Sequence, residues 1–385
     1  MRTQLVEGIR WSGGNLSTYA ILRDGPLDQD SIVAEPTLYL IEKAKHVESL
    51  NSLRSAASDL KFYFEALEKA GRDWRDITDN DMSGYIESSL IQERKLTKVS
   101  IRRNASSLAG FYSFTTEFGL TDQHFSFTFS YRNAQHKLIE QGTKKRRTNF
   151  KLHKKYINKP LFEILLYNAN ETSGFLRRRD EIVLKLGYYA GLRAFEVTHP
   201  ENLKVEDIKQ KLIQAEKQKN ISFSVLIIGK GNKVRHVDFP PALVTEISSF
   251  ISQERKGVLG ENLICATNGK PLSKSFASRL FNRVKKSSLP ALMSEIRALG
   301  EMDDPPYTIS RSSAEALTYH CLRHTYSTDL VTYCYLHDID PFTYLPNQLG
   351  HNDKDTSEDY VNFEATLHNR EWLRRRHSEI GAPTS

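Results

Sequence analysis

Cysteine is scarce in this sequence, whose 385 residues include three, Cys265, Cys321 and Cys334. Their number is odd and no two of them form a CxxC pair, which excludes a disulfide framework and a cysteine-rich zinc site. Unpaired cysteines are typical of proteins in a reducing compartment. We therefore expect a cytoplasmic protein that holds no metal.

Long apolar runs are also missing. No stretch approaches the roughly 20 apolar residues that a membrane-spanning helix needs, and residues 1–16 lack the apolar block and cleavage site of a secretory signal. Apolar residues still make up 39% of the chain and aromatic residues 10%, enough to form folded cores. Because 385 residues exceed what one core usually supports, we expect two domains and no membrane association.

The chain is moderately basic, with a formal net charge of +7. Four basic residues follow one another in mid-chain, Lys144, Lys145, Arg146 and Arg147, and further lysines extend to Lys155. Such a run is either a solvated linker or a surface that neutralises the phosphates of a nucleic acid. Both interpretations remain open, and the second predicts that these four residues bind DNA.

Hydrophobic periodicity separates a helical first part from a mixed second part. Residues 36–119 follow helical spacing, whereas the period is lost and basic residues accumulate from 121 to 158. Further on, 222–228 and 234–239 have strand composition and flank the Gly-Lys-Gly-Asn-Lys sequence of a tight antiparallel hairpin.

These patterns predict a multidomain, mainly α protein with a small amount of antiparallel β structure. The helical domain comes first and a mixed α/β domain follows it. The expected boundaries are an N-terminal extension at 1–30, the helical domain at 31–135, a basic linker at 136–158, and the mixed domain with its C-terminal tail at 159–385.

The second half contains basic, histidine and tyrosine side chains in short motifs. One motif, Gly-Leu-Arg-x-x-Glu, begins at a helix-breaking glycine, and another, His-Cys-Leu-Arg-His, places a histidine and an arginine on one helix face. A Leu-Gly-His sequence precedes a tyrosine by nine residues. The candidate catalytic residues are Arg193, Lys230, His320, Arg323, His351 and Tyr360, with Glu196 in support.

Such side chains could break a DNA strand without a metal. Two guanidinium groups bind phosphate oxygens in pairs and stabilise the charge of the transition state, by about 3–4 kcal/mol each in related sites. A lysine or histidine can protonate the leaving 5′ oxygen. A tyrosine becomes a competent nucleophile when cations and hydrogen bonds lower its pKa from about 10.

The motifs resemble those of the tyrosine recombinase family, which includes the phage integrases and the bacterial chromosome-dimer resolvases. Five family motifs occur in the family order over about residues 160 to 365. They are Gly191–Glu196, the hairpin lysine Lys230, His320–His324, Leu349–His351 with Thr356 after it, and Tyr360. The resemblance identifies the helical first part with the family's core-binding domain, which clamps duplex DNA.

This resemblance implies a specific mechanism. Tyr360 would attack the scissile phosphate and form a 3′-phosphotyrosyl bond, so that neither ATP nor a metal nor any other cofactor is needed. Arg193 and Arg323 would bind the phosphate oxygens with help from the two histidines, and Lys230 would protonate the leaving oxygen. Four protomers would act together on double-stranded DNA and exchange their C-terminal tails, through residues such as Phe363 and Trp372.

Three departures from the family pattern stand out. Residues 198–202 delay the leucine that usually follows the first motif, residues 288–311 resemble an insertion, and the first thirty residues have no family counterpart. None of these departures removes a catalytic group. The integration, excision or resolution of a mobile element or replicon all remain compatible with the sequence.

Several residues also have a simpler interpretation. Lys233 lies in the same turn as Lys230 and is a second candidate for contact with DNA. Glu196 is expected to pair with a cation, and His324 to pack or to form a hydrogen bond. Tyr333, Tyr335 and Tyr344 precede the Leu-Gly-His motif and are interpreted as core aromatic residues.

Three other functions share parts of this chemistry. A type IB topoisomerase would relax supercoils as a monomer, and a protelomerase-type resolvase would leave hairpin ends. A non-catalytic DNA-binding regulator is the third alternative, but it has no need for the complete catalytic set.

Overall fold

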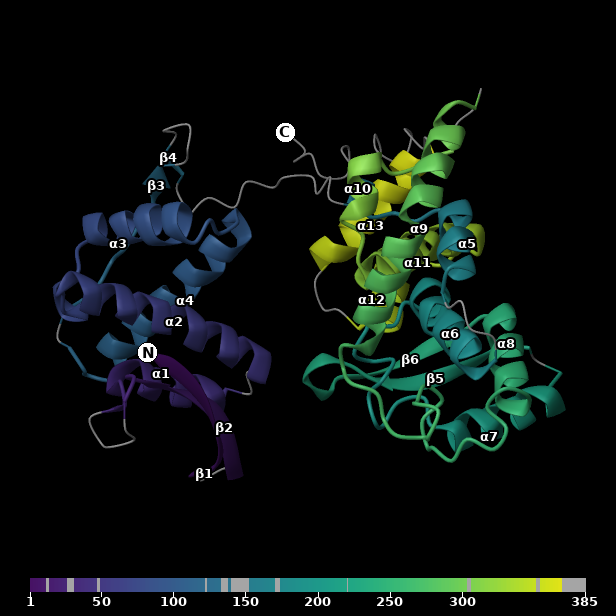
Figure 1. The fold of residues 1–385 in the computed structure, drawn as a ribbon, viewed down its shortest axis with the longest axis horizontal. Coiled ribbons are helices and arrows are strands. Elements are labelled where there is room, and N and C mark those ends of the chain that lie inside the picture. Colours follow the sequence, from purple (N-terminus) through teal and green to yellow (C-terminus); the bar gives the residue numbers. More distant parts are fainter. Residues whose placement is uncertain are drawn as a thin grey trace, which may run out of the picture. The chain divides into compact units, whose positions relative to one another are not determined.

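A computed structural model describes residues 1–11, 14–25, 31–46, 49–121, 123–132, 138–139, 152–169, 174–219, 221–302, 306–350 and 354–368. The chain forms two compact units, Met1–Arg146 and Arg147–Ser385 (Figure 1). Helices dominate both, and the described strands pair as three two-stranded antiparallel sheets. The predicted fold class, mainly α with small antiparallel β, is confirmed.

The N-terminal unit consists of a β-hairpin followed along the chain by helices. Three of its helices begin at conventional caps, because Ser49, Thr78 and Thr97 each accept a hydrogen bond from a backbone N–H of the first turn. The elements are β1 (Arg2–Trp11), β2 (Gly14–Leu22), α1 (Ala34–Lys45), α2 (Leu50–Ala70), α3 (Asp79–Tyr85) with a π-helical continuation (Ile86–Glu93), α4 (Lys98–Glu117), β3 (Tyr131–Arg132) and β4 (Leu138–Ile139).

The core of this unit is aromatic. Tyr63 of α2 and Phe111 and Tyr112 of α4 are almost completely buried and meet edge to face. The Tyr63 and Tyr112 hydroxyls lie 2.5 Å apart, and Tyr112 Oη donates to the carbonyl of Trp74 at 3.0 Å. These polar tips are therefore satisfied inside the core, which fixes α2 against α4.

The first thirty residues contribute to the same core. Ile21 of β2 is fully buried together with Leu40 of α1. Thr18 Oγ1 donates to the Leu40 carbonyl at 2.8 Å, and the Ile21 N–H donates to Thr37 Oγ1 at 3.1 Å. The hairpin is thus structurally continuous with the helices that follow it.

The C-terminal unit surrounds helix α6 with other helices. Its elements are α5 (Lys159–Tyr167), α6 (Phe175–Ala190), α7 (Val205–Lys217), β5 (Phe223–Ile228), β6 (Val234–Phe239), α8 (Pro241–Ser252), α9 (Phe276–Gly300), α10 (Arg311–Glu315), α11 (Tyr319–Leu336), α12 (Pro341–Leu349) and α13 (Lys354–Leu367). Short 3₁₀ turns occupy Leu152–Lys154 and Lys230–Asn232.

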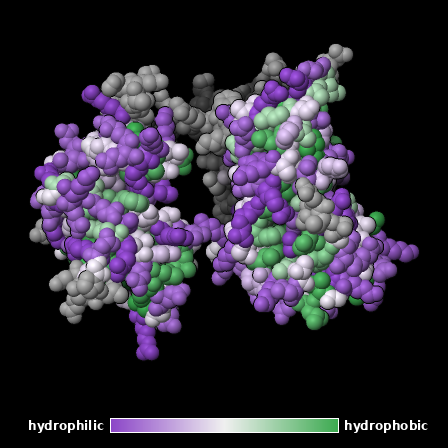
Figure 2. All heavy atoms as spheres, viewed as in Figure 1, coloured by the Kyte–Doolittle hydropathy of each residue, from purple (hydrophilic) through white to green (hydrophobic). Residues whose placement is uncertain are grey.

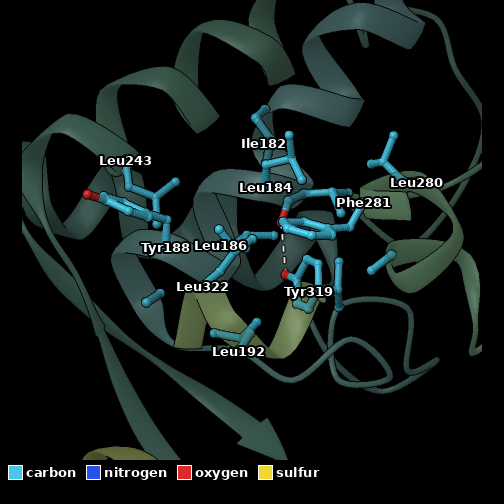
Figure 3. Packing of buried hydrophobic residues seen from close by; sticks show 14 of the residues in the cluster. Ile182, Leu184, Leu186, Tyr188, Leu192, Leu243, Leu280, Phe281, Tyr319 and Leu322 are labelled. Carbon is cyan, nitrogen blue, oxygen red and sulfur yellow. Dashed lines mark hydrogen bonds between the residues drawn. The ribbon is translucent and has the colours of Figure 1, made fainter. Parts of the chain in front are cut away.

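Helices α6 and α11 form the centre of this unit. Leu186 of α6 and Leu322 of α11 are fully buried in one cluster, and Phe281 of α9 joins them (Figure 3). Tyr319 Oη donates to the Val183 carbonyl at 2.9 Å across the same contact. This packing fixes the start of α11 beside α6, and both helices carry candidate catalytic motifs at or near their ends.

The segment that resembled an insertion is largely a helix. Helix α9 begins before this segment and continues through Pro290 to Gly300. Leu292 and Ile296 extend its buried stripe into the core, which stabilises the helix beyond the proline. Residues 288–300 therefore lengthen α9.

Both units have polar surfaces. In the view of Figure 2, hydrophilic residues cover most of each unit and apolar residues are scattered between them. Within the described residues, no helix combines the length and the apolar character needed to cross a membrane.

Two glycines of the C-terminal unit allow a test of how closely the chain at the end of α6 packs against α11. Gly191 and Gly231 both have positive φ, but a Cβ at Gly191 would lie 2.3 Å from the Tyr326 ring whereas one at Gly231 would meet nothing within 4 Å. We expect Gly231→Ala to cost about 1–2 kcal/mol of unfolding free energy from backbone strain, and Gly191→Ala to cost about 1–3 kcal/mol more. Urea unfolding of both variants measures the difference, and equal losses would contradict the close contact.

Candidate active site

The first motif folds around a buried carboxylate. Helix α6 ends at Gly191, whose left-handed φ of 61° turns the chain toward Glu196. Glu196 is fully buried and accepts hydrogen bonds from the backbone N–H and from Nη1 of Arg193, both at 2.8 Å. The expected pairing of Glu196 with a cation is thus observed, and it orients Arg193.

A second arginine shares the same carboxylate. Arg235 of β6 donates to both oxygens of Glu196, at 2.8 and 2.7 Å, and its Nε donates to the Gln348 carbonyl at 2.9 Å. Arg235 was not among the site residues predicted from the sequence. The sequence did contain a signal that Arg235 is buried. Every second residue of β6 is buried, and Arg235 shares the buried face with Val237 and Phe239.

This pairing determines the charge of Glu196. Burial alone would raise the pKa of its carboxyl, but the hydrogen bonds and charge of Arg235, together with the Arg193 N–H, hold that pKa below its usual value. Glu196 is therefore ionised at neutral pH, and the buried guanidinium of Arg235 remains compensated.

The hairpin that carries Lys230 is tied to this motif. Asn202 Nδ2 donates to the carbonyls of Glu196 and Ile228, each at 3.0 Å, and Asn202 Oδ1 accepts from the Ile228 N–H at 2.8 Å. Lys230 itself is exposed at the tip and makes no hydrogen bond or ion pair with any other described residue. Lys233 of the same turn is exposed as well.

Arg323 of α11 joins two further segments of the site. Its side chain is buried, and its two Nη atoms donate to the carbonyls of Gly191, at 2.6 Å, and of Leu349. Burial, followed by the nearby charge of Arg193, lowers the pKa of Arg323 to about 9, which leaves the guanidinium protonated at neutral pH. Arg323 thus holds the end of α6 against the end of α12.

His320 lies one turn before His324 on the same helix, with ring centroids 4.5 Å apart. The side chain of His320 is exposed at the surface, but neighbouring atoms reduce its hydration, and this effect, followed by the charges of Arg323 and Arg193, lowers its pKa. A neutral imidazole at this position can donate one hydrogen bond and accept another.

Tyr360 of α13 is 5% exposed and faces α11. Its hydroxyl lies 2.8 Å from Nδ1 of His324, and His324 Nε2 lies 3.5 Å from Nζ of Lys155. Burial raises the pKa of Tyr360, although a side-chain hydrogen bond with Ser327 and then the charges of Arg323 and Arg193 act in the opposite direction. The expected hydrogen-bonding role of His324 is observed, and its partner is the candidate nucleophile.

The remaining residues considered in the sequence are His351, a run of four basic residues and three tyrosines. His351 and the basic residues Lys144, Lys145, Arg146 and Arg147 lie outside the described residues. Tyr335 and Tyr344 are partly buried against the α11–α13 core, as expected, but Tyr333 is 44% exposed, which corrects its interpretation as a core residue. Within the described part of the chain, no group of three histidine, cysteine or acidic residues could hold a metal ion.

Two family models match this chain. The phage integrase family model matches residues 162–366, which is more than half of the sequence, and the N-terminal SAM-like domain of phage integrases matches residues 38–118. The chain therefore belongs to the phage integrase family of tyrosine recombinases, enzymes that break and rejoin DNA. The family, the enzyme class and the helical N-terminal domain predicted from the sequence are confirmed.

Individual relatives are distant. Tyrosine recombinase XerC of Leptospira interrogans is 22% identical over 284 residues, which cover 74% of this chain and 75% of the relative. Tyrosine recombinase XerC of Caldanaerobacter subterraneus is 24% identical over 339 residues, which cover 82% of this chain and 79% of the relative.

Solved structures share the fold at low identity. XerH bound to its palindromic difH substrate after cleavage aligns with a TM-score of 0.55 at 18% identity, covering 88% of this chain and 84% of that one. A lambda integrase tetramer bound to a Holliday junction aligns with a TM-score of 0.52 at 14% identity, covering 83% and 77%.

The shared carboxylate generates a prediction that depends on pH. Arg235→Met leaves the buried Glu196 with one partner, Arg193, whose side chain is 25% exposed. We expect a loss of about 3–5 kcal/mol in unfolding free energy at neutral pH. In the wild type the depressed pKa of Glu196 contributes stability above its unfolded value, whereas in the variant burial raises that pKa. The destabilisation should therefore grow from about pH 5 to about pH 8.

Urea unfolding followed by circular dichroism at both pH values checks this expectation. Arg193→Met is the matched control, since it leaves the Arg235–Glu196 pair intact and should cost less. Equal losses in the two variants, or a loss that is independent of pH, would contradict the role of Arg235 as the main partner of Glu196.

Proposed function

We propose that this site-specific recombinase cleaves DNA through Tyr360, with Arg193 and Arg323 binding the scissile phosphate. The observation that carries the proposal is the convergence of three segments. Arg323 donates to the carbonyl of Gly191, two residues before Arg193, and the next residue of α11, His324, contacts the Tyr360 hydroxyl. Two guanidinium groups thus lie close enough to the tyrosine for their charges to lower the pKa of its hydroxyl.

The proposed step conserves atoms and charge. Tyr360 Oη attacks phosphorus and loses its proton to solvent base, a 3′-phosphotyrosyl bond forms, and the bond from phosphorus to the 5′ oxygen breaks. Lys230 donates the proton that the leaving oxygen requires, and His320 and His351 assist Arg193 and Arg323 in binding the phosphate oxygens. The exposed ammonium of Lys230, without a protein partner among the described residues, suits a group that meets the substrate.

The assembly we propose is a tetramer on double-stranded DNA, supported by the lambda integrase tetramer on a Holliday junction. The C-terminal tail would pass to a neighbouring protomer. Phe363 is not part of this exchange, since it is 4% exposed and packs on His153 and Tyr307 of its own unit, which corrects the expectation from sequence. The exchanged segment would begin after α13 and include Trp372.

Two further proposals concern the chain as a whole. We infer that the predicted 136–158 linker connects an N-terminal and a catalytic domain through its residues 136–151, and that Lys144–Arg147 neutralise DNA phosphates there. Residues 152–158 belong to the catalytic unit instead, since Leu152 and Ile157 are buried in its core. A cytoplasmic location follows from a DNA substrate and agrees with three buried free cysteines.

Tyr360→Phe tests the nucleophile. A nicked suicide duplex, built from any pair of short inverted repeats that a search of the DNA beside the gene finds, should trap a detergent-resistant adduct with the wild type. The phenylalanine variant should bind the duplex with unchanged affinity and form no adduct, because it lacks the attacking oxygen. An adduct with Tyr360→Phe would assign the nucleophile elsewhere.

The products of the wild-type reaction test the alternatives. Exchange between two sites supports recombination, whereas relaxed circles without exchange would favour a topoisomerase and hairpin ends a protelomerase.

Lys230→Ala tests the proton donor, and Lys233→Ala from the same turn is its control. Cleavage of an ordinary phosphate by Lys230→Ala should slow by about 10²-fold or more. A 5′-bridging phosphorothiolate should restore the rate, because a thiolate leaves without a proton. If the sulfur substrate rescues only the Lys233 variant, that lysine is the donor instead.

A further inference from the structure

Three side chains from different segments form a chain of contacts that ends at the nucleophile. His324 of α11 lies between Lys155 and Tyr360, with Nε2 at 3.5 Å from the Lys155 ammonium and Nδ1 at 2.8 Å from the Tyr360 oxygen. Lys155 directly follows the turn Leu152–Lys154, and Leu152 shares a buried cluster with Tyr360. The packing of this turn therefore holds Lys155 near the site.

The donors and acceptors of these groups determine where the imidazole proton lies. A lysine ammonium has three donors and no acceptor, so His324 Nε2 must accept the hydrogen bond from Lys155. A neutral imidazole carries one proton, which then resides on Nδ1 and points to Tyr360. The alternative tautomer would place two donors against each other at Nε2.

His324 is neutral in this setting. Burial, followed by His320, Lys155 and Arg323, holds the pKa of His324 far below its usual value. If the ring of His324 were protonated, its positive charge would lie close to cations from two segments of the chain. His324 is therefore unsuited to take the tyrosine proton, and it is suited to donate to an oxygen that becomes negative.

We propose that His324 is a catalytic residue whose Nδ1–H stabilises the phenolate of Tyr360, and that Lys155 is a positioning residue that fixes the tautomer of His324. The inference deepens the proposed function and rests on Tyr360 as the nucleophile. During attack the Tyr360 proton leaves to solvent base, the Oη–phosphorus bond forms, and Nδ1–H remains on the ring. The charged groups that face this pair are Arg193, Lys155, Arg323 and Asp359, and the titratable His320 lies beside them.

The tautomer can be measured without DNA. In the full chain with ¹⁵N-labelled histidine, the ring nitrogens of His324 should show protonated Nδ1 and unprotonated Nε2 in NMR spectra, with His324→Gln used to assign the signals. Lys155→Met should shift the signal toward the Nε2–H tautomer, while Lys159→Met, a nearby exposed lysine, should leave it unchanged. A protonated Nε2 in the wild type overturns the proposal.

A double-mutant cycle tests the consequence for cleavage. His324→Ala removes the donor and should slow adduct formation on the nicked duplex by about 10- to 100-fold, the effect of a hydrogen bond to a charged group. His324→Asn keeps an amide N–H near the position of Nδ1 and should stay within a few-fold of the wild type. Lys155→Met should slow the wild type and have no effect in the His324→Asn background, because an amide has no tautomer to set.

The pH profile separates catalysis from structure. Loss of a donor to the phenolate raises the pKa of Tyr360, so the rate of His324→Ala should reach its plateau at higher pH than the wild type, and the gap should narrow as pH rises. A gap that is constant with pH, or equal effects of Lys155→Met in both backgrounds, would overturn the proposal. Failure of Tyr360 as the nucleophile would appear separately, as an adduct with Tyr360→Phe.

Discussion

Two guanidinium groups share the buried carboxylate of Glu196, and the remaining parts of the site are arranged around that contact. Arg193 comes from the turn after α6, and Arg235 comes from β6 and also bonds to the carbonyl of Gln348 in α12. A buried carboxylate with two arginine partners satisfies its charge and fixes the partners in space. The turn, the strand and the helix end consequently occupy one defined arrangement.

Arg323 reinforces this arrangement from another direction. Its bonds to the carbonyls of Gly191 and Leu349 use the backbone acceptors exposed where α6 and α12 end. Those groups would otherwise be buried without partners, so the arginine contributes to folding in addition to the phosphate binding that we propose for it. Its substitution should therefore not be interpreted through cleavage rates alone.

Much of this could be predicted from local signals. Gly191 after a helical stretch and the glycine-rich turn at 229–233 mark a helix end and a hairpin, and the motif order indicates the family. Arg235 was missed because one arginine in a strand becomes informative only when its alternation with Val237 and Phe239 is considered. The contact between Lys155 and His324 joins residues far apart in the sequence, and no local pattern encodes it.

We expect the contact between Lys155 and His324, which the sequence could not predict, to matter most once DNA is bound. A scissile phosphate would neutralise the charges of Arg193 and Arg323, which in the unbound protein oppose the rise in the pKa of Tyr360. The phosphate also repels a phenolate. A hydrogen-bond donor that does not contact the phosphate still stabilises the phenolate when DNA is bound, because the tautomer of the imidazole keeps the proton on the nitrogen that faces it. If Tyr360 is the nucleophile, as we propose, the arginines would stabilise the phosphate in the transition state and His324 would stabilise the oxygen that attacks it.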